Sequence, residues 1–384
     1  MTGLSFDTAV IGAGVMGAST ALHLARAGMR TVIIDRGAIC REASGVNAGT
    51  LTLHMTRAAL IPYAMAGRQR WIDAPIWLGA DVGGRAVEGM SVAFTPAEAE
   101  MVEQRAKSRR EQGAPIEVIS PARARAVEPG LNERVILAAY SEIDGYASAY
   151  LTGRAYRAAL VAAGAEIREA TAVVGVDRAA IDRTGGGFTI RTATGEVIRA
   201  RRLVLAGGVW LEQMLGWIDV TIPVKCLINQ LIVTERVRPV MRTVLGVASG
   251  LLSLKQFENG TVLIGGGWQG IGDTVRGGVE AIPDNLMGNM RLARYTIPAL
   301  AQARIARIWL GLESETSDAL PMIGAVPGVP DAYVIGCVHS GYTSGPYMGE
   351  LLAELILGKA TSMPLFDPAR LVTGGAPVRS GSVA

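Results

Sequence analysis

One stretch of the chain decides the fold: residues 7–36 read DTAVIGAGVMGASTALHLARAGMRTVIIDR. The apolar run 8–11 predicts a short buried strand, residues 18–27 predict a helix, and residues 31–34 predict a second strand that ends at Asp35. Strand, glycine turn, helix and strand in this order predict the βαβ unit of a Rossmann-type lobe.

The glycine turn carries the motif Gly12-Ala13-Gly14-Val15-Met16-Gly17. Its glycines permit a tight turn, the close approach of a pyrophosphate and helix-on-sheet packing, while the helix N-terminus offers free N–H groups to the phosphates. Asp35 follows the last glycine by eighteen residues, where a carboxylate can accept hydrogen bonds from a ribose diol. We therefore predict dinucleotide binding; the alternative is that the glycines serve packing alone. The motif does not distinguish FAD from NAD.

A loop of small residues follows Asp35, because residues 41–50 read REASGVNAGT. The backbone N–H groups of such a loop suit a second phosphate and a flavin ring. A plain surface turn is the alternative.

The composition is that of a globular enzyme, with 384 residues, 49% hydrophobic residues, 18% charged residues and 48 glycines. The net charge is +3, and the basic clusters at 105–110 and 199–202 are short, so we interpret them as solvated faces and expect no nucleic-acid partner. Three Cys and three His argue against a disulfide framework, a protein-bound metal cluster or a zinc site. No signal peptide or apolar run of membrane-spanning length is present, so we expect a cytoplasmic protein without a transmembrane segment.

Beyond residue 36 the pattern indicates a second, mostly antiparallel lobe and a return to the first lobe. Helices are expected at 97–112, 150–163 and 284–300, and strands at 167–176, 188–192, 197–200, 203–205, 228–234, 251–257 and 262–265. The triplet Gly185-Gly186-Gly187 is expected between two of the strands. Near the end we expect a strand at 333–335, a glycine loop at 336–345 and a helix at 346–357.

Several segments, in this order, resemble the D-amino-acid-oxidase family, which includes glycine oxidase, sarcosine oxidase and the catalytic subunits of opine, proline and hydroxyproline dehydrogenases. The segments are 12–17 with Asp35, SGVNAG at 44–49, VLAGGVW at 204–210, DALPMIG at 318–324, and residues 336–349. The resemblance covers nearly the whole chain. It implies a bound FAD and hydride transfer from the carbon beside an amine nitrogen to flavin N5, giving an imine that water hydrolyses.

The resemblance implies an α/β fold with an α+β substrate lobe: a Rossmann-type FAD-binding lobe made of discontinuous segments, and a mostly antiparallel sheet over the flavin. We expect the FAD-binding domain at 1–75, 142–221 and 310–371, the substrate-binding domain at 76–141 and 222–309, and a flexible tail at 372–384.

The resemblance also implies which residues hold FAD. Val173 would offer its backbone to the adenine, and residues 341–345 would line the pyrimidine edge, where a helix N-terminus favours the negative charge of a reduced flavin. For the last segment, a helix cap with Pro346 in the first turn is the alternative. The expected set is Gly12, Gly14, Val15, Met16, Gly17, Asp35, Arg36, Ser44, Asn47, Ala48, Gly49, Thr50, Leu51, Val173, Ala206, Gly207, Gly208, Trp210, Gly341, Tyr342, Thr343, Ser344 and Gly345.

The sequence departs from the family where glycine oxidase and sarcosine oxidase hold a substrate carboxylate. Glycine-oxidase-like members have an Arg five residues before the Asp that matches Asp318, and this chain has Glu313 there. Sarcosine-oxidase-like members have a Lys where this chain has Thr343. Gly311 matches the residue that forms the covalent flavin link in some sarcosine oxidases, and because glycine has no side chain we expect non-covalent FAD. A small α-amino acid held as in glycine oxidase is therefore disfavoured. Glu313 can instead pair with a substrate ammonium or guanidinium, or serve as a structural carboxylate.

Other residues are weaker candidates for the substrate site. Tyr342, Gln256 and Trp268 can face the substrate, or pack in a loop or the core. The cations expected for any bound carboxylate are His54, Arg57 and Lys255, each of which can instead pair on the surface or within a helix.

We predict FAD-dependent oxidation of a primary or secondary amine of amino-acid type, with an opine-like, cyclic or N-substituted amino acid favoured. An NAD-dependent dehydrogenase and a non-catalytic flavin-binding subunit are the alternatives. Opine and hydroxyproline dehydrogenase subunits of this size work beside iron–sulfur partners. Since this chain lacks the cysteines for such a cluster, its electrons would pass to a partner subunit, a quinone or O₂.

Overall fold

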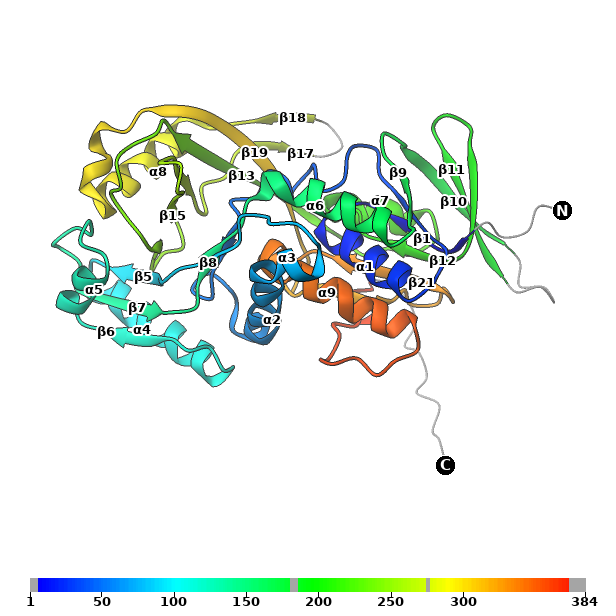
Figure 1. Ribbon diagram of the computed structural model, residues 1–384, viewed down its shortest axis with the longest axis horizontal. Helices are drawn as coiled ribbons and strands as arrows, with labels where there is room; N and C mark the ends of the chain where they lie inside the picture. Colours follow the sequence, from blue (N-terminus) through cyan, green and yellow to red (C-terminus); the bar gives the residue numbers. More distant parts are fainter. Residues whose placement is uncertain (1–5, 180–185, 274–276, 373–384) are drawn as a thin grey trace.

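The computed structural model describes residues 6–179, 186–273 and 277–372. Two eight-stranded sheets occupy opposite ends of the molecule (Figure 1). Strands of the first sheet come from three separate parts of the chain, and strands of the second come from two parts inserted between them. Gly185 of the expected glycine turn and residues 373–384 of the expected tail lie outside the described residues.

The first sheet is centred on β1 (Phe6–Ile11), which runs parallel to its two neighbours, β2 (Thr31–Ile34) and β12 (Val197–Leu205). Its other strands are β9 (Glu166–Arg168), β10 (Val173–Ala179), β11 (Gly187–Thr192), β20 (Met322–Ala325) and β21 (Ala332–Gly336). All four residues of β2 are buried, as expected for a parallel strand covered on both faces.

Two strand predictions in this sheet were wrong. The strand expected at 167–176 is two strands: β9 pairs with β2, β10 pairs with β11, and the chain turns between them at Ala170, whose φ is 50°. The strands expected at 197–200 and 203–205 are one continuous strand, β12, because its first half pairs with β11 and its second half with β1 and β21.

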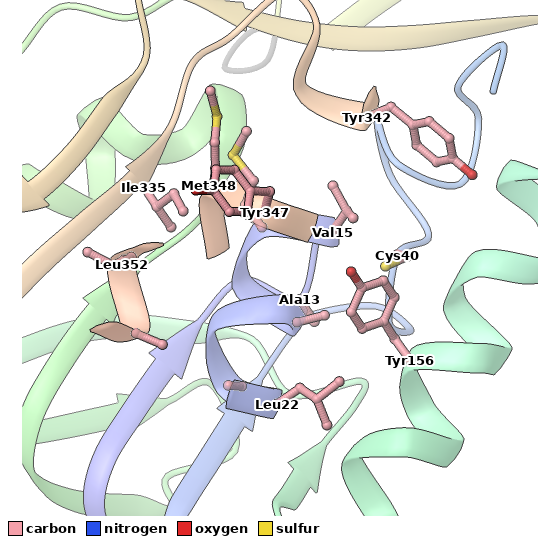
Figure 2. Packing of buried hydrophobic residues seen from close by; sticks show 14 of the residues in the cluster. Ala13, Val15, Leu22, Cys40, Tyr156, Ile335, Tyr342, Tyr347, Met348 and Leu352 are labelled. Carbon is pink, nitrogen blue, oxygen red and sulfur yellow. The ribbon is translucent and has the colours of Figure 1, made fainter. Parts of the chain in front are cut away.

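Helices α1 (Val15–Arg26), α2 (Ile61–Ile72), α6 (Ala149–Ala162) and α9 (Gly341–Ile356) supply one large core cluster beside this sheet. Figure 2 shows part of that cluster, with Val15 and Met348 at the meeting of α1 and α9 and Tyr156 approaching from α6. A Cβ on Gly345 would lie 2.6 Å from a methyl carbon of Val15, so the close packing of α9 on α1 depends on this glycine. The packing brings the last helix of the chain against the first.

Helix α9 begins at Gly341, five residues before the predicted start, and Pro346 lies inside it. Proline has no N–H, so the Tyr342 carbonyl one turn earlier loses its helical partner. That carbonyl instead accepts a hydrogen bond of 2.7 Å from Trp71 Nε1. A distant side chain thus stabilises a helical turn that the local sequence does not predict.

The second sheet has the order β19-β13-β16-β15-β14-β5-β7-β6, and within the described residues its neighbours are antiparallel except β14 beside β5. Its strands are β5 (Gly89–Ala93), β6 (Glu117–Ile119), β7 (Leu137–Ser141), β13 (Lys225–Thr234), β14 (Val244–Val247), β15 (Ser253–Gln256), β16 (Val262–Gly265) and β19 (Ile305–Glu315). Strand β19 pairs with β13 along its length. Residues 310–315, expected in the FAD-binding domain, therefore belong to this sheet.

Three helices flank the second sheet: α4 (Pro96–Glu111), α5 (Pro121–Val127) and α8 (Pro283–Thr296). Helix α4 begins with a capping box in which Thr95 accepts from the Glu98 N–H and the Glu98 carboxylate accepts from the Thr95 N–H. The short elements are β3 (Thr50–Leu51), α3 (Ala74–Trp77), β4 (Arg85–Ala86), β8 (Gly145–Tyr146), α7 (Leu211–Gly216), β17 (Ile271–Asp273), β18 (Gly277–Glu280), and the 3₁₀ turns Ala58–Leu60, Gly208–Trp210, Pro298–Gln302 and Pro368–Leu371. Every helix in the described ranges is too short or too polar to cross a lipid bilayer.

Candidate active site

A cavity of about 1010 Å³ is lined by segments of both lobes. In the first lobe it runs along the ends of β1 and β2 and the start of α9, and in the second it reaches β13, β19 and α4. This volume lies at the upper end of the range for small-molecule sites, so it has room for a dinucleotide together with a substrate.

The turn between β1 and α1 forms a cradle that only glycine permits. A Cβ on Gly12 would lie 2.4 Å from the Ala206 carbonyl oxygen, and one on Gly17 would lie 2.1 Å from the Gly12 carbonyl oxygen. The first turn of α1 contains no acidic residue, and the Val15 N–H donates to Ser44 Oγ at 3.0 Å. A helix N-terminus without a carboxylate, facing a cavity, fits a pyrophosphate.

Asp35 and Arg36 line the same end of the cavity. The Asp35 carboxylate accepts hydrogen bonds of 2.7 Å from the N–H groups of Ala13 and Gly37, which fix its orientation after β2. The guanidinium carbon of Arg36 lies 3.7 Å from the ring centroid of Trp210, a cation–π contact at the cavity wall. These groups fit a ribose and the base beyond it.

The N-terminus of α9 lies at the other end of the site. No side chain caps it, its first turn has no acidic residue, and Gly341, Tyr342 and Thr343 line the cavity. Thr343 Oγ1 donates to the Thr50 carbonyl at 2.9 Å, which joins this turn to the loop after Asp35. Two uncapped helix N-termini, those of α1 and α9, therefore face one cavity and fit the two negatively charged parts of a reduced FAD.

Of the residues expected to hold the cofactor, all but four line the cavity. The four exceptions are packed elsewhere. Gly49 and Gly345 lie where a Cβ would clash with neighbouring atoms, Leu51 lies in the first-lobe core, and Ser344 Oγ donates to the Ser340 carbonyl. The contacts of the remaining residues with FAD stay a prediction.

The carboxylate of Glu313 on β19 accepts hydrogen bonds from two polar side chains at the cavity. Its Oε1 lies 2.5 Å from His339 Nδ1 and its Oε2 lies 2.5 Å from Asn229 Nδ2 on β13. A carboxylate only accepts hydrogen bonds, so in the neutral form of the His339 ring the proton is on Nδ1 and Nε2 carries the lone pair. All three residues line the cavity.

The electrostatics of His339 follow from this geometry. The hydrogen bond to Glu313 raises the pKa of His339 above its usual value, burial opposes the rise, Arg57 lowers the pKa and Glu315 raises it further. Arg57 and Glu315, whose charges act on His339 in opposite directions, form an ion pair of 2.8 Å with each other. When the His339 ring is neutral, the pair of Glu313 and His339 carries one negative charge beside the α9 N-terminus.

Tyr342 does not present its hydroxyl to a substrate. Its ring is buried and stacks on Trp71 with centroids 4.6 Å apart and planes 10° apart, and its hydroxyl lies 2.8 Å from Thr152 Oγ1. Burial raises the pKa of Tyr342. The predicted catalytic role is not supported; the alternative, packing, describes this side chain.

Gln256 and Trp268, unlike Tyr342, do not line the cavity. The Gln256 side chain binds backbone groups of the second lobe, with Oε1 accepting from the Val240 N–H at 2.8 Å. The Trp268 ring packs against Gly288 of α8, and its N–H donates to the Leu251 carbonyl at 2.7 Å. Their predicted contact with substrate is not supported by this arrangement.

The three cations expected for a substrate carboxylate differ in placement. His54 lines the cavity, but its Nε2–H donates to the Gly89 carbonyl at 3.2 Å, and burial lowers its pKa, so it is neutral. Arg57 lines the cavity and is exposed. Lys255 is buried and does not line the cavity; its Nζ donates to Thr50 Oγ1 at 2.6 Å, and burial lowers its pKa to about 7.

Sequence reasoning missed His339 and Asn229. His339 lies within the segment 336–349 that carries part of the family resemblance, so its place in that segment was a usable signal. No sequence signal pointed to Asn229, because its role depends on the pairing of β13 with β19, in which Asn229 lies opposite Gly311.

A Rossmann-type lobe with a phosphate-binding turn, joined to an antiparallel lobe over one shared cavity, defines a two-lobe flavoprotein. The model of the family described as DAO, FAD dependent oxidoreductase, matches residues 7–355, and the chain belongs to this family. It is an FAD-dependent oxidoreductase, which confirms the predicted resemblance, fold class and cofactor.

Similar proteins align with this chain over nearly its whole length. An opine oxidase subunit from Rhizobium meliloti is 27% identical over 355 residues, covering 88% of this chain and 89% of its own. The crystal structure of glycine oxidase from Geobacillus kaustophilus superposes with a TM-score of 0.83 at 25% identity, covering 97% of this chain and 99% of that one. L-proline dehydrogenase from P. horikoshii shares the fold, with a TM-score of 0.85 at 22% identity over 96% of this chain and 98% of that one.

Proposed function

We propose that the protein oxidises the carbon–nitrogen bond of a secondary amine of amino-acid type, with opine-like substrates favoured over cyclic or other N-substituted amino acids. The observation that carries the proposal is the Glu313–His339 pair at the cavity, in a position where glycine-oxidase-like members have an arginine. The similarity to a protein named as an opine oxidase subunit supports the same substrate class.

The first task of the pair is to attract the substrate nitrogen. An amine of this kind enters as an ammonium ion, and when His339 is neutral the negative charge of Glu313 favours a cation at this wall of the cavity. Asn229 holds Glu313 Oε2, so the carboxylate is already oriented before the substrate arrives.

The second task is to remove a proton, because an ammonium nitrogen has no lone pair to form an imine. We propose that His339 Nε2 accepts that proton as a general base and that Glu313 is a positioning residue that stabilises the resulting imidazolium through Nδ1–H. FAD, when bound, accepts the hydride from the carbon beside the nitrogen.

The residues also bear on how FAD is held and reoxidised. Gly311 offers no side chain for a covalent link, which supports non-covalent FAD. Because one relative is named as a subunit, we propose that electrons pass to a partner subunit, with a quinone or O₂ as the other acceptors. We propose that any iron–sulfur cluster is held by the partner subunit and not by this chain.

Product analysis tests the substrate class. The FAD-loaded protein is incubated with octopine, nopaline, proline, hydroxyproline or sarcosine and an artificial electron acceptor, and products are identified by mass spectrometry. For octopine we expect arginine and pyruvate, since water splits the imine into an oxo acid and a primary amine. Turnover of glycine and other primary amino acids, with none of the five secondary amines oxidised, would overturn the proposal.

A further inference from the structure

The cavity has a strongly basic part on the side of the second lobe. It is lined by Thr56, Arg57, Arg105, Ser108, Arg109 and Ser249, and we call these six residues the basic arm. Arg105 and Arg109 are one helical turn apart on α4, so their side chains share one face of that helix. The sequence pattern alone assigned them to a solvated face.

Within the part of the chain that the structure describes, no carboxylate pairs with Arg105 or Arg109 of α4. Arg109 Nε donates to the Thr56 carbonyl at 2.9 Å, and Arg105 Nη1 donates to the Ala248 carbonyl. Among the described residues neither forms an ion pair, and the acidic residues that line the cavity, Asp35, Glu42 and Glu313, are outside the basic arm. Each guanidinium therefore retains donors for another acceptor.

The charge of Arg105 disfavours the charged form of Arg109. Burial first, and then the charge of Arg105, lower the pKa of Arg109 to about 10, while the buried carboxylate of Asp144 opposes the shift. Asp144 does not line the cavity, because its oxygens accept from Thr52 and from the Leu53 N–H. Two cations in such a place are stabilised when an anion binds between them.

The basic arm begins next to the proposed general base. Thr56, whose carbonyl receives Arg109, has its hydroxyl 3.1 Å from Ser340 Oγ, and Ser340 is adjacent to His339 and precedes α9. The charge of Arg57, the residue after Thr56, lowers the pKa of His339. The arm is separate from the phosphate-binding turn, which lies on the first lobe at the ends of β1 and β2.

We propose that Arg105 and Arg109 form a subsite for a second carboxylate of the substrate, the one on the nitrogen substituent, while the amine lies at His339. The subsite rests on the proposed function and narrows it to N-substituted amino acids with a carboxylate on each side of the nitrogen. Arginine suits this ligand because its planar fork matches a carboxylate with two parallel hydrogen bonds. Arg105 is exposed and Arg109 is half-buried, so Arg105 places one edge of the subsite at the surface.

Two ligands that differ by one carboxylate test the subsite. Binding of octopine and of N²-ethylarginine, which lacks the carboxylate of the carboxyethyl group, is measured by calorimetry on FAD-loaded protein reduced beforehand, so that no turnover occurs. We expect Arg109→Gln and Arg105→Gln each to weaken octopine binding about 10- to 100-fold and to change N²-ethylarginine binding less than about twofold. Arg109→Lys, which keeps the charge and loses the fork, should give a smaller loss than Arg109→Gln.

Arg110→Gln is the matched control, because Arg110 is the next residue of α4, is exposed and does not line the cavity. It should leave both affinities unchanged. Equal losses for the two ligands in Arg109→Gln and Arg105→Gln, or no loss, would overturn the subsite. Failure of both ligands to bind, while proline still reduces the flavin, would also overturn it and leave the proposed function intact; failure of every secondary amine to reduce the flavin would overturn the proposed function itself.

Discussion

Glu313 Oε1 and His339 Nδ1 lie 2.5 Å apart although one residue belongs to a strand of the second sheet and the other to the segment before the last helix. The contact joins the two lobes at the cavity wall, and it makes the charge of one residue depend on the other. Removing the carboxylate should therefore change both how the substrate binds and the pH at which it reacts.

We expect Glu313→Gln to shift the pH profile of kcat/KM. The neutral form of His339 is the active form, so kcat/KM rises with pH through its pKa, which Glu313 raises. Without the carboxylate that midpoint should move to lower pH, and a cationic substrate should bind about 1 to 3 kcal/mol more weakly. The exposed Glu258→Gln, outside the cavity, is the control. An unmoved midpoint would assign Glu313 a purely structural role.

Tyr342→Phe should affect stability and not catalysis. The substitution removes the hydroxyl that contacts Thr152 and keeps the stacking on Trp71, so unfolding should become easier by about 1 kcal/mol. Thermal denaturation and steady-state kinetics measure the two effects. A fall of kcat beyond about tenfold with unchanged stability would restore the catalytic interpretation of Tyr342.

The sequence predicts local structure here better than contacts between distant segments. The βαβ unit at 7–36 was predicted correctly because its glycines, apolar runs and Asp35 act within a few residues of one another. The start of α9 was missed because the partner of the Tyr342 carbonyl, Trp71, is 271 residues away. Glu313 was predicted from its motif, yet its partners came from another strand and another loop, which no local pattern specifies.

Gly14→Val tests the phosphate cradle. The Gly14 backbone, with φ of −63° and ψ of 171°, accepts a side chain, and a Cβ there would meet Ser44 Oγ at 3.4 Å. The fold should therefore survive while the added methyl groups obstruct the pyrophosphate, and FAD affinity should fall about tenfold or more. Gly216→Val, at a position with open space around the Cβ, should retain FAD. Flavin absorbance per protein after gel filtration measures the outcome; full FAD content in Gly14→Val would contradict the assignment.

Lys255→Met should stabilise the fold, most of all at low pH. Burial lowers the pKa of Lys255 from 10.5 to about 7, so between these pH values the unfolded chain binds more protons and the stability of the native protein rises with pH. Below pH 7 the full penalty of the buried charge is present, and methionine should remove about 1 to 3 kcal/mol of it. Denaturant unfolding at pH 6 and pH 9 should show a smaller gain at pH 9. A gain that grows with pH would contradict the buried charge.

Anaerobic mixing of the FAD-loaded protein with octopine tests the central claim most directly, with nopaline, proline, hydroxyproline and sarcosine in parallel. If the cavity between the two lobes holds FAD and brings an amine to it, at least one of these secondary amines should bleach the oxidised-flavin absorbance, with one flavin reduced per amine oxidised. A protein that stays colourless after reconstitution with FAD, or a bound flavin that none of the five compounds reduces, would contradict the account.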